Sequence, residues 1–230
     1  MIILVGILGA VLGSIANALI SRLPLNIAWS KGRSVCDHCK HELSILDLFP
    51  IFSFLLLGGR CRYCKKKIQI RNLVVEISMS IFFILIYYYQ LSIIYYLLMF
   101  VSVVIAVMDW ESMLISDKML FILAGAVLLT GHGDWRGALL GAGFIGLLWL
   151  VTKKQAMGEG DILLMGILGY WLGLSKTITA LWWAFVIGAI VGIILIFFKI
   201  KTRKDPIAFG PFLLIGSWIA YTWGCGVFCF

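Results

Sequence analysis

Two aspartates stand at the borders of apolar segments, where a carboxylate is costly to place and most often has a function. Asp109 ends one apolar run and Asp161 begins another, 52 residues further along the chain. Two apposed carboxylates cannot both ionise cheaply, so they share one proton. One can then take a proton from water while the other protonates a peptide carbonyl, which is the chemistry of an aspartic peptidase. The pattern predicts a catalytic pair. The alternative for each is a helix-end aspartate solvated by lipid headgroups, and Asp161 could also simply cap its helix.

Three nearby residues could support this pair. Gly158 and Gly160 precede Asp161 in Gly158-Glu159-Gly160-Asp161, and glycines let another backbone approach closely. Asp117 follows Asp109 by eight residues. It could assist the pair, although its chemistry alone favours capping of the following helix. Glu111 and Glu159 are interpreted as solvated side chains.

Four cysteines in two CxxC pairs have the spacing of a four-thiolate zinc site: Cys36, Cys39, Cys61 and Cys64. They lie in a polar loop of about 50 residues, 21–72, which is too short to bury a core of its own. A bound metal supplies the missing free energy, and four available thiolates favour a structural zinc ion over a catalytic one. Disulfides are the alternative, and His38 and His41 are expected to be bystanders rather than ligands.

The elements that would position these residues are membrane helices. Apolar residue types form 62% of the 230 residues and charged types only 13%, and residues 77–108 carry no formal charge. A spanning helix needs about 20 such residues. We therefore predict an all-α, polytopic membrane bundle of about eight spans, with the first apolar segment retained: 2–20, 73–90, 92–108, 117–131, 137–152, 161–174, 177–198 and 207–224. The predicted domains are 1–90, which contains the cysteine loop, and 91–230, which contains both aspartates.

The net charge of +8 orients this bundle and gives no indication of nucleic acid binding. Ten of the 19 Lys and Arg residues lie between Arg22 and Arg71, and others gather at 153–154 and 199–204. With eight spans, these clusters fall on one face, and only Arg136 and Lys176 fall on the other. Because basic loops stay in the cytoplasm, the cysteine loop and both aspartates are expected at the cytoplasmic face, in contact with the lipid bilayer.

Several motifs resemble the type IV prepilin peptidases, including the competence-associated members. Gly158-Glu159-Gly160-Asp161 resembles the GxGD signature of aspartic peptidases that act at membranes. The segment from Gly13 to Pro24 resembles the GxxxNxxxxRxP element of the family, and residues 36–64 resemble its tetracysteine region. Pro206-Ile-Ala-Phe-Gly-Pro-Phe212 resembles its PxAFGPF turn. The resemblance covers most of the chain, with these elements in the family order.

The resemblance implies that Asp109 and Asp161 cleave the leader of type IV prepilins or pilin-like precursors, in the bacterial cytoplasmic membrane. It also implies methylation of the new N-terminus with S-adenosylmethionine as a further activity. Leu163 replaces a common Lys, Ser116 replaces a common Pro, and the segment from Arg71 to Glu76 departs from the usual RYPxVE. The last departure bears on methylation and substrate docking more than on proteolysis.

Two other classes of function fit parts of the sequence. A proton-coupled transporter could use the two aspartates, but it would need a carboxylate pathway to the far face, where Asp134 is the only acid. A noncatalytic scaffold could dock partners on the cysteine loop, but it would leave the Gly-x-Gly-Asp segment without a role. Serine-type catalysis lacks a histidine, because His132 falls on the opposite face. The sequence does not indicate an oligomeric state.

Overall fold

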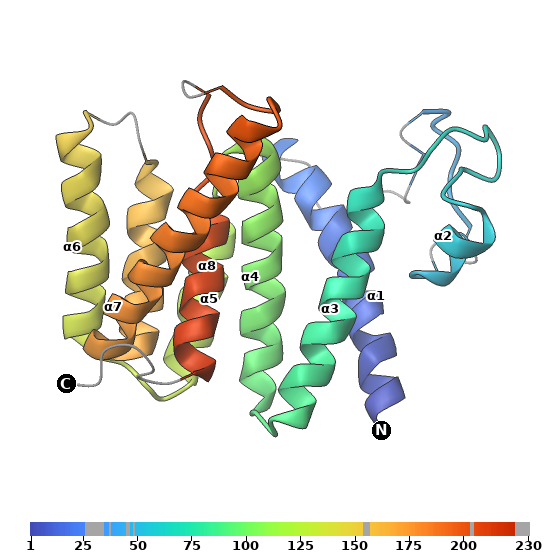
Figure 1. Cartoon of the computed structure of the whole chain (residues 1–230). Coiled ribbons are helices and arrows are strands. Elements are labelled where there is room, and N and C mark those ends of the chain that lie inside the picture. The colour runs from blue at the N-terminus through green and yellow to red at the C-terminus, as the bar shows by residue number, and fades with distance from the viewer. Residues whose placement is uncertain are drawn as a thin grey trace. The chain divides into compact units, whose positions relative to one another are not determined.

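The computed structural model describes residues 1–25, 35–36, 38–44, 47, 49–153, 157–202 and 205–223, and these are mostly helical (Figure 1). Within these ranges no strand forms, and the only pairings are two isolated bridges, Val35–Glu42 and Arg60–Lys67. The all-helical prediction is therefore confirmed. The helices are α1 (Ile2–Arg22), η1 (Leu23–Leu25), α2 (Phe52–Leu56), α3 (Ile70–Tyr88), α4 (Ile93–Ser112), α5 (Asp117–Leu129), α6 (Trp135–Val151), α7 (Glu159–Phe197) and α8 (Gly210–Thr222). Of the predicted basic clusters, Lys31, Arg33, Lys154, Arg203 and Lys204 lie outside the described residues.

In the described part of the chain, four helical segments are long and apolar enough to cross a membrane: Ile2–Leu25, α3, α4 and α7. Helix α6 is apolar but has 17 residues, and α5 and α8 have 13 each. At 1.5 Å per residue, 13 residues extend about 20 Å, which is less than the hydrocarbon core of a bilayer. A helical segment does occur near each of the eight predicted positions, but the count of eight spans is not confirmed.

The break in α7 divides this 39-residue helix into two segments. Gly173 lies at φ 75° and ψ 174°, a backbone conformation that favours glycine. Directly after the break, Thr177 Oγ1 donates a hydrogen bond of 2.7 Å to the carbonyl of Gly173. The sequence predicted two helices that part between residues 174 and 177, so the break is real but comes slightly earlier.

The chain forms two compact units, Met1–Val104 and Ile105–Phe230, so α4 begins in the first and ends in the second. The predicted boundary after residue 90 coincides instead with the turn between α3 and α4, and it stays a prediction. In the first unit, α1 packs on α3 through glycines. A Cβ at Gly9 would lie 2.7 Å from the carbonyl oxygen of Met79, and one at Gly13 equally close to the Cα of Glu76. Such contacts let two helix backbones approach closely.

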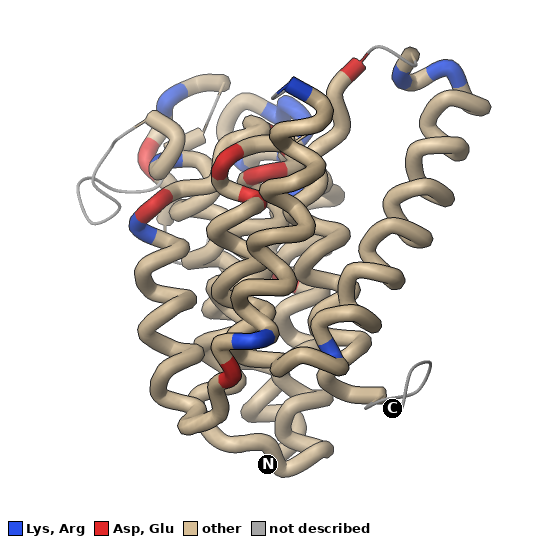
Figure 2. Tube along the Cα trace, turned by 90° about the vertical axis from the view of Figure 1, so that its left-hand side faces the viewer, with Lys and Arg blue, Asp and Glu red and all other residues tan. Residues whose placement is uncertain are grey.

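In the second unit, α7 packs against α6 and α8 and, less extensively, against α5. Gly137 of α6 lies directly against the carbonyl of Gly169 on α7, so these two backbones also touch. Figure 2 shows that charged residues gather in loops and at helix ends, whereas the middle turns of the helices are largely uncharged. This pattern is typical of helices that cross a bilayer.

Candidate active site and metal centre

Asp109 lies in the last turn of α4, and its side chain is buried, with 5% of the residue exposed. Its Oδ2 accepts a hydrogen bond of 3.0 Å from the backbone N–H of Gly210, the first residue of α8. A Cβ at Gly210 would lie 2.7 Å from the same Oδ2, so only glycine fits here without displacement. The carboxylate of Asp109 therefore sits at the N-terminus of α8, where backbone N–H groups and the helix dipole favour an anion.

Asp161 occupies the third position of α7 and is 6% exposed. Its Oδ2 accepts a hydrogen bond of 3.0 Å from the N–H of Gly158, the N-cap residue, so it does cap its helix. Its Oδ1 is buried and has no hydrogen-bond partner among the residues that the structure describes. A buried oxygen without a partner is costly, which points to a proton, a water molecule or a substrate group at this position.

Ile115, in the turn before α5, connects the two aspartate sites. Its side chain would contact a Cβ on Gly160 at 3.0 Å and one on Gly210 at 3.5 Å. The N-termini of α7 and α8 therefore both contact the side chain of Ile115, and each of these helix ends holds one of the two carboxylates. Among the described residues, neither carboxylate has a Lys or Arg within ion-pair distance. The arrangement brings two buried, unneutralised carboxylates together, and such a pair can share and transfer a proton.

The predicted supporting residues differ in their positions. Gly158 is exposed, and a Cβ there would meet nothing closer than 3.7 Å, so its surface is open. Gly160 instead packs on Ile115. Asp117 is an exposed first residue of α5, and its part in catalysis stays a prediction. Sequence reasoning missed the contacts of Gly210 and Ile115 with the pair; the motif around Gly210 was the one available signal.

The four cysteines form a compact cluster in the first unit. Their Sγ atoms all lie within 4.8 Å of one another, and neither His38 nor His41 belongs to the cluster. Cys36 Sγ and Cys64 Sγ are 3.9 Å apart, and all four cysteines are free thiols, so the disulfide alternative has no support. Zinc–sulfur bonds of about 2.3 Å place tetrahedral ligands about 3.8 Å apart, so the spacing fits a four-coordinate metal.

The two halves of the cluster make the same turn. The N–H of Cys36 donates to the carbonyl of His41, and that of Cys61 donates to Lys66 five residues on, at 3.0 and 2.9 Å. Lys40 and Lys65 occupy equivalent positions in these turns, each with positive φ. Two similar knuckles thus present their thiols to a common centre.

Electrostatics at the cluster favour a bound cation. Backbone N–H groups of Cys39 and then His38 help to lower the pKa of Cys36 to about 7. At Cys64 the N–H of Lys66 acts to lower the pKa, but burial and the neighbouring thiols together raise it to about 11. Four thiols this close cannot all ionise without a positive charge between them, and a divalent metal provides that charge.

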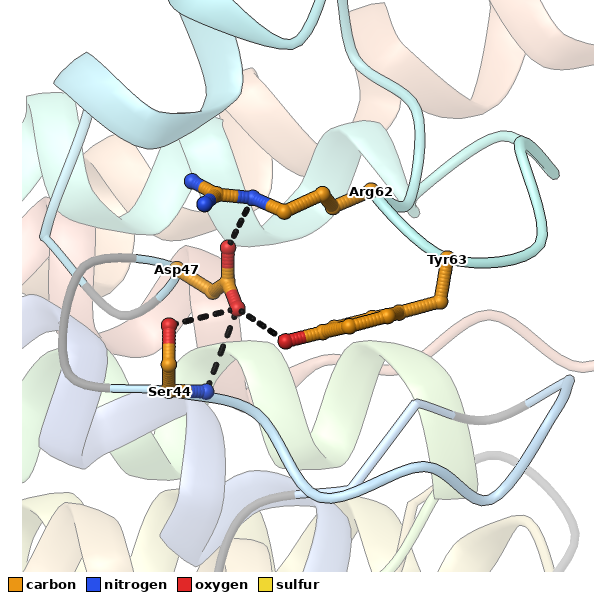
Figure 3. A network of polar contacts seen from close by, with 4 residues as sticks. All are labelled: Ser44, Asp47, Arg62 and Tyr63. Carbon is orange, nitrogen blue, oxygen red and sulfur yellow. Dashed lines mark hydrogen bonds and ion pairs between the residues drawn. The ribbon is translucent and has the colours of Figure 1, made fainter.

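Asp47 lies between the two knuckles in sequence, and it connects Ser44 to Arg62 and Tyr63 of the second knuckle (Figure 3). Its Oδ2 accepts hydrogen bonds from the amide and hydroxyl of Ser44 at 3.1 and 2.7 Å, and from the Tyr63 hydroxyl at 3.5 Å. Its Oδ1 lies 2.9 Å from Arg62 Nε, and the Asp47 side chain is 4% exposed. Burial acts to raise the pKa of Asp47, but Ser44 and the charge of Arg62 hold it below the ordinary value of 3.8.

Polar side chains also tie the loop and α1 to the start of α3. Glu76 Oε2 accepts a hydrogen bond of 2.8 Å from the N–H of Ile51, a residue with φ 62°. Asn17 of α1 donates to the carbonyl of Asn72, and Arg71 donates to the hydroxyl of Ser21, each at 3.0 Å. Residues 71–76, which depart from the usual RYPxVE of the family, thus still connect α1 and the loop to α3 within the first unit.

Comparisons with known proteins agree with the resemblance. Residues 7–90 match the bacterial peptidase A24 N-terminal domain, and residues 96–193 match the type IV leader peptidase family. Relatives named prepilin leader peptidase/N-methyltransferase include one from Aeromonas hydrophila, 34% identical over 84% of this chain and 72% of its own length. The relative from Bacillus subtilis is 29% identical over 97% of this chain and 95% of its own length. No solved structure matches the chain. The chain belongs to the type IV leader peptidase family.

Proposed function

We propose that this protein is an aspartic endopeptidase that removes the leader from type IV prepilins or pilin-like precursors, with Asp109 and Asp161 as its catalytic residues. The observation that carries the proposal is that two buried carboxylates lie at the N-termini of α7 and α8, and that both of these helix ends contact Ile115. The relatives' name supports the substrate class.

In the proposed reaction the two carboxylates hold one proton between them. The ionised carboxylate takes a proton from a water molecule, whose oxygen attacks the scissile carbonyl carbon. The protonated carboxyl gives its proton to the carbonyl oxygen. The C–N bond then breaks as the leaving amine accepts a proton from the pair, so one water is consumed and no covalent enzyme intermediate forms. The N–H groups of Gly158 and Gly210 hold one oxygen of each carboxylate in place.

Membrane placement follows from the distribution of charge. In the second unit, Lys118 in the first turn of α5 and Lys153 and Lys199 in loops lie at the helix ends that carry Asp109 and Asp161. Arg136 and Lys176 lie in or beside the turns at the other ends. The positive-inside bias therefore supports an active site at the cytoplasmic face of the bacterial membrane. The number of spans remains eight in this proposal.

The cysteine cluster is proposed to hold a structural zinc ion. Cys36, Cys39, Cys61 and Cys64 would be its ligands, and the ion would stabilise a loop that has little core. The relatives' name also includes N-methyltransferase, which would draw its methyl group from S-adenosylmethionine. The two described cavities are lined by second-unit residues and do not indicate a site for this cofactor, so no residue is assigned to it. The family match gives no support to proton-coupled transport.

The test is cleavage of a membrane-inserted prepilin by Asp109→Asn and Asp161→Asn in vesicles. Each substitution keeps the shape but removes the proton chemistry, so we expect cleavage to fall by about 10³-fold or more. Glu111→Gln and Glu159→Gln are matched controls, since each removes an exposed charge two residues from the pair and should cut at nearly the wild-type rate. Normal cleavage by both aspartate variants would disprove the assignment.

A further inference from the structure

One side of the short helix α2, in the first unit, is apolar and exposed. Phe52, Leu55 and Leu56 are 59%, 64% and 86% exposed, and positions i, i+3 and i+4 of a helix share one face. Phe49, just before the helix, is also exposed, and the centroid of its ring lies 5.8 Å from that of Phe52. We call these four residues the α2 face. Neighbouring large apolar side chains that stay exposed together mark an interaction surface.

The opposite side of α2 packs on the segment that follows it. A Cβ at Gly59 would lie 2.9 Å from the ring of Phe54, so the two residues are in close contact. The N–H of Gly59 donates to the carbonyl of Phe54, and its carbonyl accepts from the N–H of Ile68, each at 2.8 Å. Helix α2 is therefore fixed to the second knuckle by one side, which leaves the α2 face exposed on the other.

A hydrogen bond within the first unit sets the level of α2 along the helix α3. The N–H of Ile51, the N-cap residue of α2, donates to Glu76 Oε2 at 2.8 Å. Helix α3 begins at Ile70 and is long and apolar enough to cross a membrane. Glu76 lies six residues into this helix, which is about 9 Å along its axis. Helix α2 is therefore held beside the first turns of α3 and not beyond its end (Figure 1).

The segment that joins α2 to α3, residues 57–69, is basic. It contains five Lys and Arg residues and no Asp or Glu, and Lys65, Lys66 and Lys67 are exposed. Basic segments next to a membrane helix are attracted to anionic phospholipids. An apolar face followed by basic residues is complementary to the bilayer interface, where acyl chains meet headgroups. A second copy of this chain would bring another basic segment close to the first, and charge repulsion opposes such a contact.

We propose that the α2 face inserts into the membrane leaflet at which α3 begins, and that residues 57–69 bind the anionic phospholipids of that leaflet. The cysteine loop is then held against the membrane surface. Cys61 and Cys64 belong to the basic segment, so a metal bound by the cluster also fixes the shape of the surface that contacts lipid. The inference requires α3 to lie in a bilayer, but it does not depend on the assignment of the catalytic aspartates.

The first experiment is site-specific photo-crosslinking of the full chain in vesicles of phosphatidylethanolamine and phosphatidylglycerol. A photoreactive residue replaces Leu55 or Leu56 of the α2 face. The matched control replaces Val35, an exposed apolar residue of the same loop that lies in the first knuckle and pairs with Glu42. We expect at least fivefold more crosslinked phospholipid from the two α2 positions than from Val35.

Equal crosslinking of phospholipid from the α2 face and from Val35 would overturn the proposal. Crosslinks from the α2 face to a second copy of the chain, in place of lipid, would overturn it as well and would make this face a contact between copies. Zinc content is measured for each protein, so that loss of the folded loop is distinguished from loss of membrane contact.

A second measurement tests the basic segment. Phosphatidylcholine replaces phosphatidylglycerol in the vesicles, and we expect lipid crosslinking from Leu56 to fall about threefold. Lys66→Gln and Lys67→Gln together remove two exposed charges and leave the cysteines in place. This double variant should give the lower yield in both kinds of vesicle. Equal yields for the unsubstituted segment in the two kinds of vesicle would show that residues 57–69 do not bind anionic phospholipid.

Discussion

The two sites differ in the groups that form them. The first unit holds the cysteine cluster, and the second unit holds the aspartate pair. The cluster uses two short segments that make the same turn, and its metal-binding atoms are all side-chain thiols. The aspartate pair uses ends of α4, α7 and α8, and backbone N–H groups of glycines fix its carboxylates. A local motif depends on its ligands, whereas a site between helices depends on how closely their backbones pack.

The largest expected effect concerns the metal. Cys61→Ser removes the most buried of the four thiols, which is 4% exposed, and leaves a set that cannot close a tetrahedral thiolate site. We expect bound zinc to fall from about one per chain to nearly none, and the loop to lose several kcal/mol of stability. Elemental analysis and protease resistance of the loop would measure both changes.

His38→Asn is the matched control for the metal, because His38 lies between two of the cysteines but outside the cluster. It should retain zinc. If Cys61→Ser also kept a full equivalent of zinc, the four-thiolate assignment would be untenable. Loss of zinc from His38→Asn alone would make that histidine a ligand.

The second prediction concerns backbone packing at the aspartates. Gly210→Ala places a Cβ 2.7 Å from Asp109 Oδ2, so the carboxylate or the start of α8 must move. A shift of this kind typically costs about 100-fold in rate, and we expect that loss in kcat for prepilin cleavage. The zinc content should stay at the wild-type level, which separates this effect from that of Cys61→Ser.

Gly125→Ala provides the control for Gly210→Ala, since a Cβ at Gly125 on α5 meets nothing within 4 Å. Its cleavage rate should match that of the wild type. Wild-type kcat in Gly210→Ala would show that the N–H of Gly210 does not position the carboxylate.

The same contrast explains what the sequence could predict. CxxC spacing is local, so it identified all four members of the cluster, and long apolar runs identified where helices form. The predicted break between the spans 73–90 and 92–108 is present as the turn between α3 and α4, with Gln90 at φ 53°. Gly210 contacts Asp109, 101 residues away, and Ile115 contacts the first turns of both α7 and α8. The spacing of residues along the chain does not predict such long-range contacts. The number of membrane spans could not be predicted from the sequence either. Apolar character indicates that a helix forms, but it does not fix how long that helix is.

The smallest expected effect concerns Asp47, which supports the cluster from the side. Asp47→Asn weakens its hydrogen bonds to Ser44 and its ion pair with Arg62, whose own side chain is 46% exposed. Exposure of that partner limits the loss, and we expect about 1 kcal/mol less stability of the loop. The pKa of Asp47 lies below 3.8 in the folded protein, so the wild type should hold this advantage at and above about pH 5. The advantage should shrink as pH falls below 3.8 and Asp47 becomes protonated in both folded and unfolded chains.

Hydrogen exchange of loop amides, compared between wild type and Asp47→Asn at each pH, would measure the difference. Because acid also weakens zinc binding in both proteins, only the difference between them reports on Asp47. A difference that stays constant from pH 6 to pH 3 would show that its charge does not stabilise the loop.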